Sequence, residues 1–130
     1  MNVRNVELED AEAARLLGVV RIAVGAVMLV APRLGARLWT GERDPSATTV
    51  LVARGMGGRD LALGIGLVTA LEKGAPTRGW LEAGVVADAS DTFGALVSSG
   101  ELPLLRRLAT LATAGGAVWL GLRLAGSLDD

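Results

Sequence analysis

The sequence contains no cysteine and no histidine, and lysine occurs only once, as Lys73. The absence of cysteine excludes disulfides, thiolate metal sites and a cysteine nucleophile. The absence of histidine excludes His–metal sites and Ser–His–Asp chemistry, so we expect neither a metal ion nor a cofactor. The formal net charge of -1 gives no basic excess, so a nucleic-acid partner is not expected either.

Aromatic residues are also scarce, at 3%, although hydrophobic residues make up 51% of the 130 residues. The apolar content is therefore Leu, Val and Ala, which is typical of close-packed helices rather than of a β-sandwich. Glycine is abundant, at 18 residues, and recurs inside apolar runs. Membrane helices tolerate such glycines because small residues let two backbones approach closely. The composition thus favours an all-α membrane protein.

Turn-forming segments divide the chain into four apolar stretches, each of about 20 residues, the length that spans a hydrocarbon core. We predict these stretches to be helices over residues 11–31, 48–71, 78–97 and 103–124. Asp10 and Thr77 are the expected N-caps of the first and third helices. The sequence therefore predicts a single domain, residues 1–130. Its expected fold is an antiparallel up-down-up-down four-helix transmembrane bundle in the cell membrane.

Charged residues interrupt three of these four stretches, and the longest uncharged run extends only from Leu108 to Leu122. A soluble four-helix domain with unusually apolar helices, such as an obligate oligomer, is therefore the alternative. Trp39, Trp80 and Trp119 lie near segment ends, as interfacial anchors do. Arginine and lysine are divided about equally between the two sides, so the sequence does not predict an orientation.

Ionisable residues recur near the middle of the first three segments. Arg21 lies in the first segment, Arg59 and Asp60 lie in the second, and Asp88 and Asp91 lie in the third. Consecutive helices joined by short loops run antiparallel, so their midpoints come to the same depth. We therefore predict a layer of Arg–Asp pairs at mid-bilayer, where an unpaired charge costs at least about 2.5–3.5 kcal/mol.

The residues next to these charges indicate that the pairs form between helices. Arg21 has Gly18 and Gly25 on its own face, which allows a neighbouring helix to come close. Arg59 and Asp60 are adjacent and point about 100° apart, so each is expected to pair with another helix. Arg54 completes a balance of three arginines against three aspartates, or else extends to the headgroups.

Two stretches, VARGMGGRDLALGIGL from Val52 and RGWLEAGVVADASDTFGAL from Arg78, resemble a family of small integral membrane proteins known only as a domain of unknown function. The family pattern is Arg-x-x-Gly-x-Arg-Asp-Leu-x-Leu-Gly on the second helix and Ala-Asp-x-x-Asp on the third. The matching residues are Arg54, Gly57, Arg59, Asp60, Leu61, Leu63, Gly64, Ala87, Asp88 and Asp91. The resemblance covers about residues 16–97, with Glu82 as a departure. It implies a four-helix membrane fold and no particular activity.

Intramembrane ionisable residues mark a functional site by default. We interpret the layer as the site of an acid–base isomerase, cyclase or epoxide-opening hydrolase that acts on a lipophilic small molecule or lipid. The expected catalytic residues are Asp88 and Asp91 as the acid–base pair, and Asp60 as the residue that orients an arginine. The expected substrate-binding residues are Arg59, Arg21, Arg54, Thr92 and Trp80.

Two other functions use the same residues. The polar layer could bind or transport protons, a small solute or a lipid, and four helices make a thin pathway, so a homo-oligomer would be expected. Alternatively, the charges could only fix the register of the helices in a structural subunit, because buried ion pairs often add little net stability.

Overall fold

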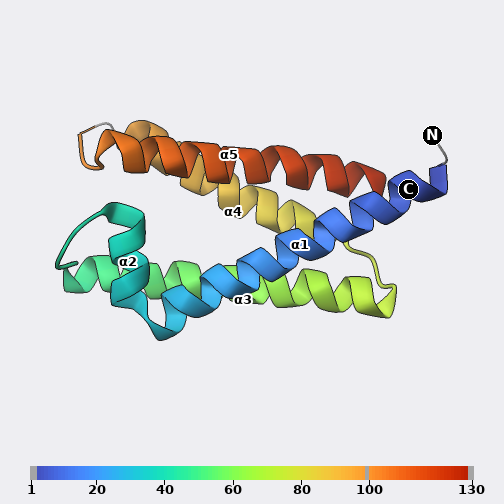
Figure 1. Cartoon of the computed structure of the whole chain (residues 1–130), viewed down its shortest axis with the longest axis horizontal. Coiled ribbons are helices and arrows are strands. Elements are labelled where there is room, and N and C mark those ends of the chain that lie inside the picture. Colours follow the sequence, from blue (N-terminus) through green and yellow to red (C-terminus); the bar gives the residue numbers. More distant parts are fainter. Residues whose placement is uncertain (1–2, 99, 129–130) are drawn as a thin grey trace.

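The computed structural model describes residues 3–98 and 100–128, and this part of the chain is helical and contains no strand (Figure 1). The prediction of an all-α protein is therefore confirmed. The described residues form five helices: α1 (Val3–Val30), α2 (Pro32–Thr40), α3 (Ala47–Lys73), α4 (Arg78–Val97) and α5 (Leu104–Ser127).

Four of these helices correspond to the predicted ones, and α4 has the predicted bounds. Thr77 occupies the N-cap position of α4, as predicted, but its side chain makes no capping hydrogen bond there. Asp10 is not a cap, because α1 begins at Val3 and extends through the acidic segment that was expected to precede it. Local charge and turn signals therefore located the ends of α4 correctly and the start of α1 incorrectly.

Helix α2 was not predicted, and the segment around residues 32–40 was expected to be a turn. Pro32 occupies the first turn of α2, where its missing N–H costs nothing and its fixed φ suits a helix. Gly41 ends the helix in the left-handed conformation, with φ of 81°. A proline taken as a stop signal for α1 is therefore also the start signal of the next helix.

Helices α1 and α3 pack backbone against backbone through glycines. A Cβ on Gly25 would lie 2.7 Å from the carbonyl oxygen of Gly57, and a Cβ on Gly64 would lie 2.6 Å from that of Gly18. Both distances are too short for any side chain, so only glycine permits this approach. The glycine-lined face predicted around Arg21 is thus the face that meets α3.

The helices are arranged as two pairs. Helix α1 lies obliquely over α3, α5 lies along α4, and the four long helices run in alternating directions along the molecule (Figure 1). Contacts between the two pairs are much sparser than contacts within each pair. An evenly packed four-helix bundle is therefore not confirmed, since the two helix pairs contact each other only sparsely.

Two of the helices are long and apolar enough to cross a membrane: Asn5–Val30, with a mean hydropathy of 2.0, and Leu104–Ser127, with a mean hydropathy of 1.3. Only 28% and 22% of these stretches are buried within the chain, unlike the core helices of soluble proteins, which are mostly buried. Helices α3 and α4 do not qualify as spans, contrary to the prediction of four, because too many charged residues interrupt them.

Candidate functional site

Arg21 is the centre of a charged network that joins three helices. Its Nη1 atom lies 3.2 Å from Oδ1 of Asp60 on α3, and its Nη2 atom donates to Oδ2 of Asp88 on α4. Arg21 and Asp88 are only 8% and 6% exposed. One guanidinium therefore holds two carboxylates that come from the two different helix pairs.

Arg59 extends the same network along α3 and α4. It donates from Nη1 to Oδ1 of Asp91 at 3.1 Å and from Nη2 to Oδ2 of Asp91 at 2.8 Å. This bidentate geometry is the one that guanidinium and carboxylate groups favour. Arg59 also contacts Oδ1 of its neighbour Asp60 at 3.3 Å, although the two were expected not to pair. Asp60 therefore links the two arginines.

Glycine also shapes this network. A Cβ on Gly84 of α4 would lie 3.0 Å from Nη2 of Arg21. Gly84 thus leaves the space on α4 that the guanidinium of Arg21 occupies beside Asp88. Gly84 lies four residues before Asp88, on the same face of α4, but the sequence alone does not show that Arg21 of α1 approaches this position.

The network contains one more aspartate than arginine. Arg54 was expected to balance the third aspartate, but it is exposed and forms no ion pair with any described residue. It lies five residues before Arg59, which places it on a different face of α3. Of the two alternatives expected for Arg54, the pairing with a third aspartate is not observed and an exposed position is; the remaining five groups carry a formal charge of one negative unit.

Two carboxylate oxygens of the network are not engaged by the protein. Within the described residues, Oδ1 of Asp88 and Oδ2 of Asp60 accept no hydrogen bond. Every buried side-chain nitrogen or oxygen atom in this part of the chain has a partner, so these two oxygens are accessible. Both oxygens of Asp91, in contrast, are held by Arg59.

A cleft of about 1000 Å³ lies between the two helix pairs and reaches the network. Arg21, Asp60, Asp88 and Asp91 line it, and they are the only charged residues to do so in the part of the chain that the structure describes. Most of the remaining lining is apolar: Leu17, Val20, Ala23, Val24, Val27, Met28, Leu38, Trp39, Val52, Met56, Ala95, Leu102, Ala114 and Ala117. The cleft therefore combines a long apolar wall with one charged region, as small-molecule sites commonly do.

The structure brings together the three predicted catalytic aspartates and two of the predicted substrate-binding residues, Arg21 and Arg59. Of these two, Arg21 lines the cleft and Arg59 does not; the other three substrate-binding residues, Arg54, Thr92 and Trp80, also lie outside the lining. Thr92 donates its hydroxyl to the backbone oxygen of Asp88 at 2.7 Å, so that hydroxyl is already used. Trp80 packs its ring against Gly66 of α3, where a Cβ would lie 2.3 Å from ring atoms. Trp80 thus joins α3 to α4.

Two features of this region were missed at the sequence level. Leu38 and Trp39 of α2 line the cleft, because α2 folds back beside the ends of α1 and α3. Asp10 is 3% exposed and accepts a hydrogen bond of 2.7 Å from Arg123, which ties α1 to α5. The signal available in the sequence for the ion pair between Asp10 and Arg123 was an acidic residue within an extended helical pattern.

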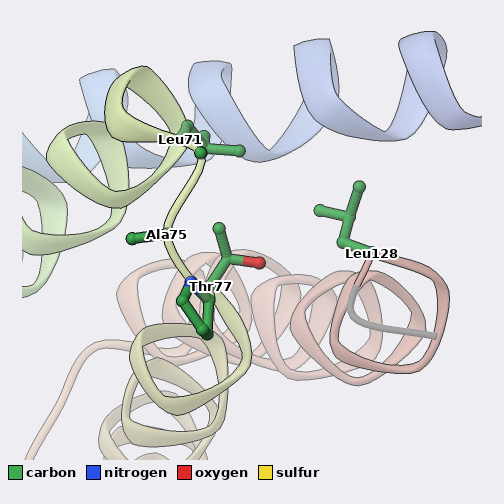
Figure 2. A pocket seen from close by; sticks show the side chains of 6 residues that line it. Leu71, Ala75, Thr77 and Leu128 are labelled. Carbon is green, nitrogen blue, oxygen red and sulfur yellow. The ribbon is translucent and has the colours of Figure 1, made fainter.

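A second cavity of about 460 Å³ lies where the loop between α3 and α4 approaches the end of α5. Figure 2 shows Leu71, Ala75 and Leu128 around it, with the hydroxyl of Thr77 as the polar group among the labelled side chains. Among the described residues, those that line this cavity carry no charged side chain. It offers little chemistry, so the charged cleft is the stronger candidate site.

No family model, no curated protein and no solved structure matches the chain. The resemblance of residues 16–97 to a membrane family therefore stays a prediction. The argument for function accordingly depends on the geometry of the cleft.

Proposed function

We propose that this chain is an integral membrane protein that takes up a lipophilic molecule in the cleft between its helix pairs and exchanges a proton with the polar end of that molecule. The observation that carries this proposal is the composition of the cleft. An apolar wall leads to carboxylates that are fixed by arginines and yet have two accessible oxygens. Such a site suits a molecule with an apolar body and one reactive polar group.

The distribution of polarity supports the membrane part of the proposal. Arg21 and Asp88 are buried, whereas Val30 and Leu105 are 83% and 76% exposed. A water-soluble protein rarely buries such charges while exposing apolar side chains over most of its length. Lipid reverses the preference, because intramembrane charges face the interior of a helix assembly. Each exposed apolar face would then contact acyl chains.

The three carboxylates differ in whether both of their oxygens are bound by arginine, and this difference supports the acid–base part of the proposal. Asp88 and Asp60 have accessible oxygens that can accept a proton and return it, so we assign the proton exchange to them. Asp91 is fully engaged by Arg59, and its proposed role is to position that arginine. This assignment replaces the pairing of Asp88 with Asp91 expected from their spacing. It suits isomerisation, cyclisation or epoxide opening, which need only a carboxylic acid and a carboxylate.

Membrane integration is tested by alkaline carbonate extraction of the expressed full chain. We expect the protein to stay in the membrane pellet, because its apolar faces have no cover in water. Release into the supernatant would contradict the membrane part of the proposal and favour an oligomer in which copies cover these faces.

Uptake into the cleft is tested by fluorescence quenching with ω-bromoundecanol, a lipophilic probe with a heavy-atom tail. One variant keeps only Trp39, which lines the cleft, and carries Trp80→Phe and Trp119→Phe. The reference keeps only Trp119, which is exposed on α5, and carries Trp39→Phe and Trp80→Phe. In detergent micelles we expect saturable quenching of Trp39 and linear quenching of Trp119. Linear quenching of both would show simple partitioning and contradict the cleft as a binding site.

Proton exchange is tested on the same complex by infrared difference spectroscopy. Adding ω-bromoundecanol should perturb a carboxyl band that disappears in Asp88→Asn. The control is Asp44→Asn, which removes an exposed carboxylate that pairs with Arg33 far from the cleft lining. A band that is unchanged in Asp88→Asn would remove this residue from the proposed chemistry.

A structural role for the network is the second candidate, because its ion pairs join α1, α3 and α4. A reciprocal exchange tests it, with Arg59→Asp combined with Asp91→Arg. If the network serves only assembly, the double variant should recover both the stability lost in the single variants and unaltered quenching by the probe. If the network forms a site, stability should recover while the binding of the probe stays altered.

A further inference from the structure

We infer that the cleft selects lipophilic molecules whose head group is a hydrogen-bond-donating cation, in the manner of a protonated alkyl amine. This inference rests on the proposed function, since it names the chemical class of the molecule that the cleft takes up. It follows from the charge balance, the accessible oxygens and the shape of the same cleft.

The first argument is the charge balance. Asp60, Asp88 and Asp91 contribute three negative charges, and Arg21 and Arg59 contribute two positive charges. Among the described residues, the charged ones that line the cleft are Arg21 and the three aspartates, while Arg59 reaches the network from outside the lining. When all five groups are ionised the network carries one uncompensated charge, which is costly away from water. A proton on Asp60 or Asp88 removes it, and so does a positive charge brought by a ligand, so an amine can take up that proton as it binds. An anionic head group would double it instead.

The second argument is the placement of the acceptors. Asp60 and Asp88 bind the two terminal nitrogens of the same guanidinium of Arg21, so their carboxylates lie on either side of one group. Each keeps one accessible oxygen. Two carboxylate oxygens from different helices thus present acceptors at the charged region of the cleft, and an ammonium group offers three donors to such oxygens.

The third argument excludes other head groups. Three of the four hydroxyls that line the cleft, those of Ser90, Thr110 and Thr113, donate to backbone carbonyls of their own helices, and the fourth belongs to Ser98 at the end of α4. The first three hydroxyls are therefore not free to donate to an anion. No group of three or more potential ligand side chains among the described residues could hold a metal ion. A monovalent organic cation fits the site better than an anion or a divalent metal.

The shape of the cleft sets the body of the molecule. Its apolar wall continues along α1 from Arg21 to Met28, a rise of about 10 Å for seven helical residues. The wall then continues over Leu38 and Trp39 of α2. An alkyl chain whose head lies at the carboxylates would therefore extend toward Trp39. This geometry places the tail bromine of a medium-chain probe where it can quench that side chain.

The test compares head groups on one body, using the full chain that retains only Trp39 in detergent micelles near neutral pH. The probes are ω-bromoundecylamine, ω-bromoundecanol, ω-bromoundecanoic acid and the quaternary trimethylammonium analogue of the amine. We expect the amine to bind about tenfold more tightly than the alcohol, because charge-assisted hydrogen bonds are roughly twice as strong as neutral ones. The acid should bind most weakly, and the quaternary analogue should bind less tightly than the amine because it lacks donors.

The variant Asp60→Asn makes the network formally neutral, so the amine should lose its preference over the alcohol. Asp44→Asn removes the same charge at an exposed position and should leave the preference unchanged. If Asp60→Asn does not fold, which circular dichroism reports, Asp88→Asn provides the same loss of charge. In either variant the readout is the ratio of the amine affinity to the alcohol affinity, and the preference for the amine should disappear.

The outcomes separate the two proposals. Equal affinities of the amine and the alcohol in the otherwise unaltered site, with saturable quenching by both, would overturn the inference and leave lipophilic uptake standing. A preference that persists in Asp60→Asn and Asp88→Asn would overturn it too, since the network would then not be its source. Absence of saturable quenching by every probe would overturn the proposed function itself.

Discussion

Helix α3 forms two interfaces, one with α1 and one with α4, and these two seams are built in opposite ways. Toward α1, glycines bring the two backbones into contact, and a Cβ on Gly57 would lie 2.8 Å from the oxygen of Gly25. Toward α4, contacts are few, and Arg59 reaches across to Asp91 while Trp80 of α4 lies on Gly66. One seam is closed by backbone packing, and the other is bridged by long side chains.

This difference shows how a chain of 130 residues can have both a rigid support and an accessible polar site. The glycine seam fixes the position of Arg21 relative to Asp60, because both residues lie on the helices that it joins. The seam between the pairs leaves a cleft in which the network is exposed to a ligand. Substitutions in the two seams should therefore have different consequences.

The largest effect is expected from Arg21→Leu, which leaves Asp60 and Asp88 without their shared partner. Breaking a buried ion pair by removing one member costs about 3–5 kcal/mol. The control is Arg15→Leu on the same helix, whose pair with Glu72 is exposed and should contribute no more than about 1 kcal/mol. Chemical unfolding in detergent, followed by circular dichroism, measures both. Similar losses for the two variants would contradict the central role of Arg21.

A smaller loss is expected from Gly57→Ala in the glycine seam. Its methyl group would meet Gly25, Met28 and Leu29 at 2.8 Å, and overpacking of this kind costs about 1–3 kcal/mol. Gly58→Ala is the matched control, because no atom lies within 4 Å of its Cβ position and alanine there should stabilise the helix by about 0.5–1 kcal/mol. The expected result is that the two substitutions change the free energy of unfolding in opposite directions. The same sign for both would show that α1 and α3 do not pack through this face.

The smallest effect on stability is expected from Gly84→Ala, which displaces the guanidinium of Arg21 without removing any charge. Moving a side chain off its preferred rotamer costs about 0.5–1.5 kcal/mol. Gly79→Ala, on the same helix with open space at its Cβ position, should not destabilise the protein. The binding of ω-bromoundecylamine should weaken in Gly84→Ala and stay unchanged in Gly79→Ala. An unaltered affinity in Gly84→Ala would show that the position of the Arg21 guanidinium does not affect binding of the amine.

The sequence predicted the all-helical class, the bounds of α4 and the convergence of five charged residues on one region. These features follow from local rules, since apolar segment length, turn residues and the alternation of helix direction are visible in the order of residues. The glycines around Arg21 also predicted the face that another helix approaches. Four of the eight expected site residues lie outside the cleft lining, however, and α2 was missed because Pro32 served as both a stop and a start.

By itself, the sequence determined that the chain is all-helical, where α4 lies and which charged side chains come to a similar height along the helices, because these properties depend on neighbours along the chain. Only the tertiary structure decided that Arg21 holds Asp60 and Asp88 together, that Arg54 stays outside the network, and that the helices separate into two pairs with a cleft between them. Those outcomes depend on how each helix is rotated about its axis and on how closely the backbones approach. Packing between distant segments sets both, and here the glycines of α1 and α3 permit it.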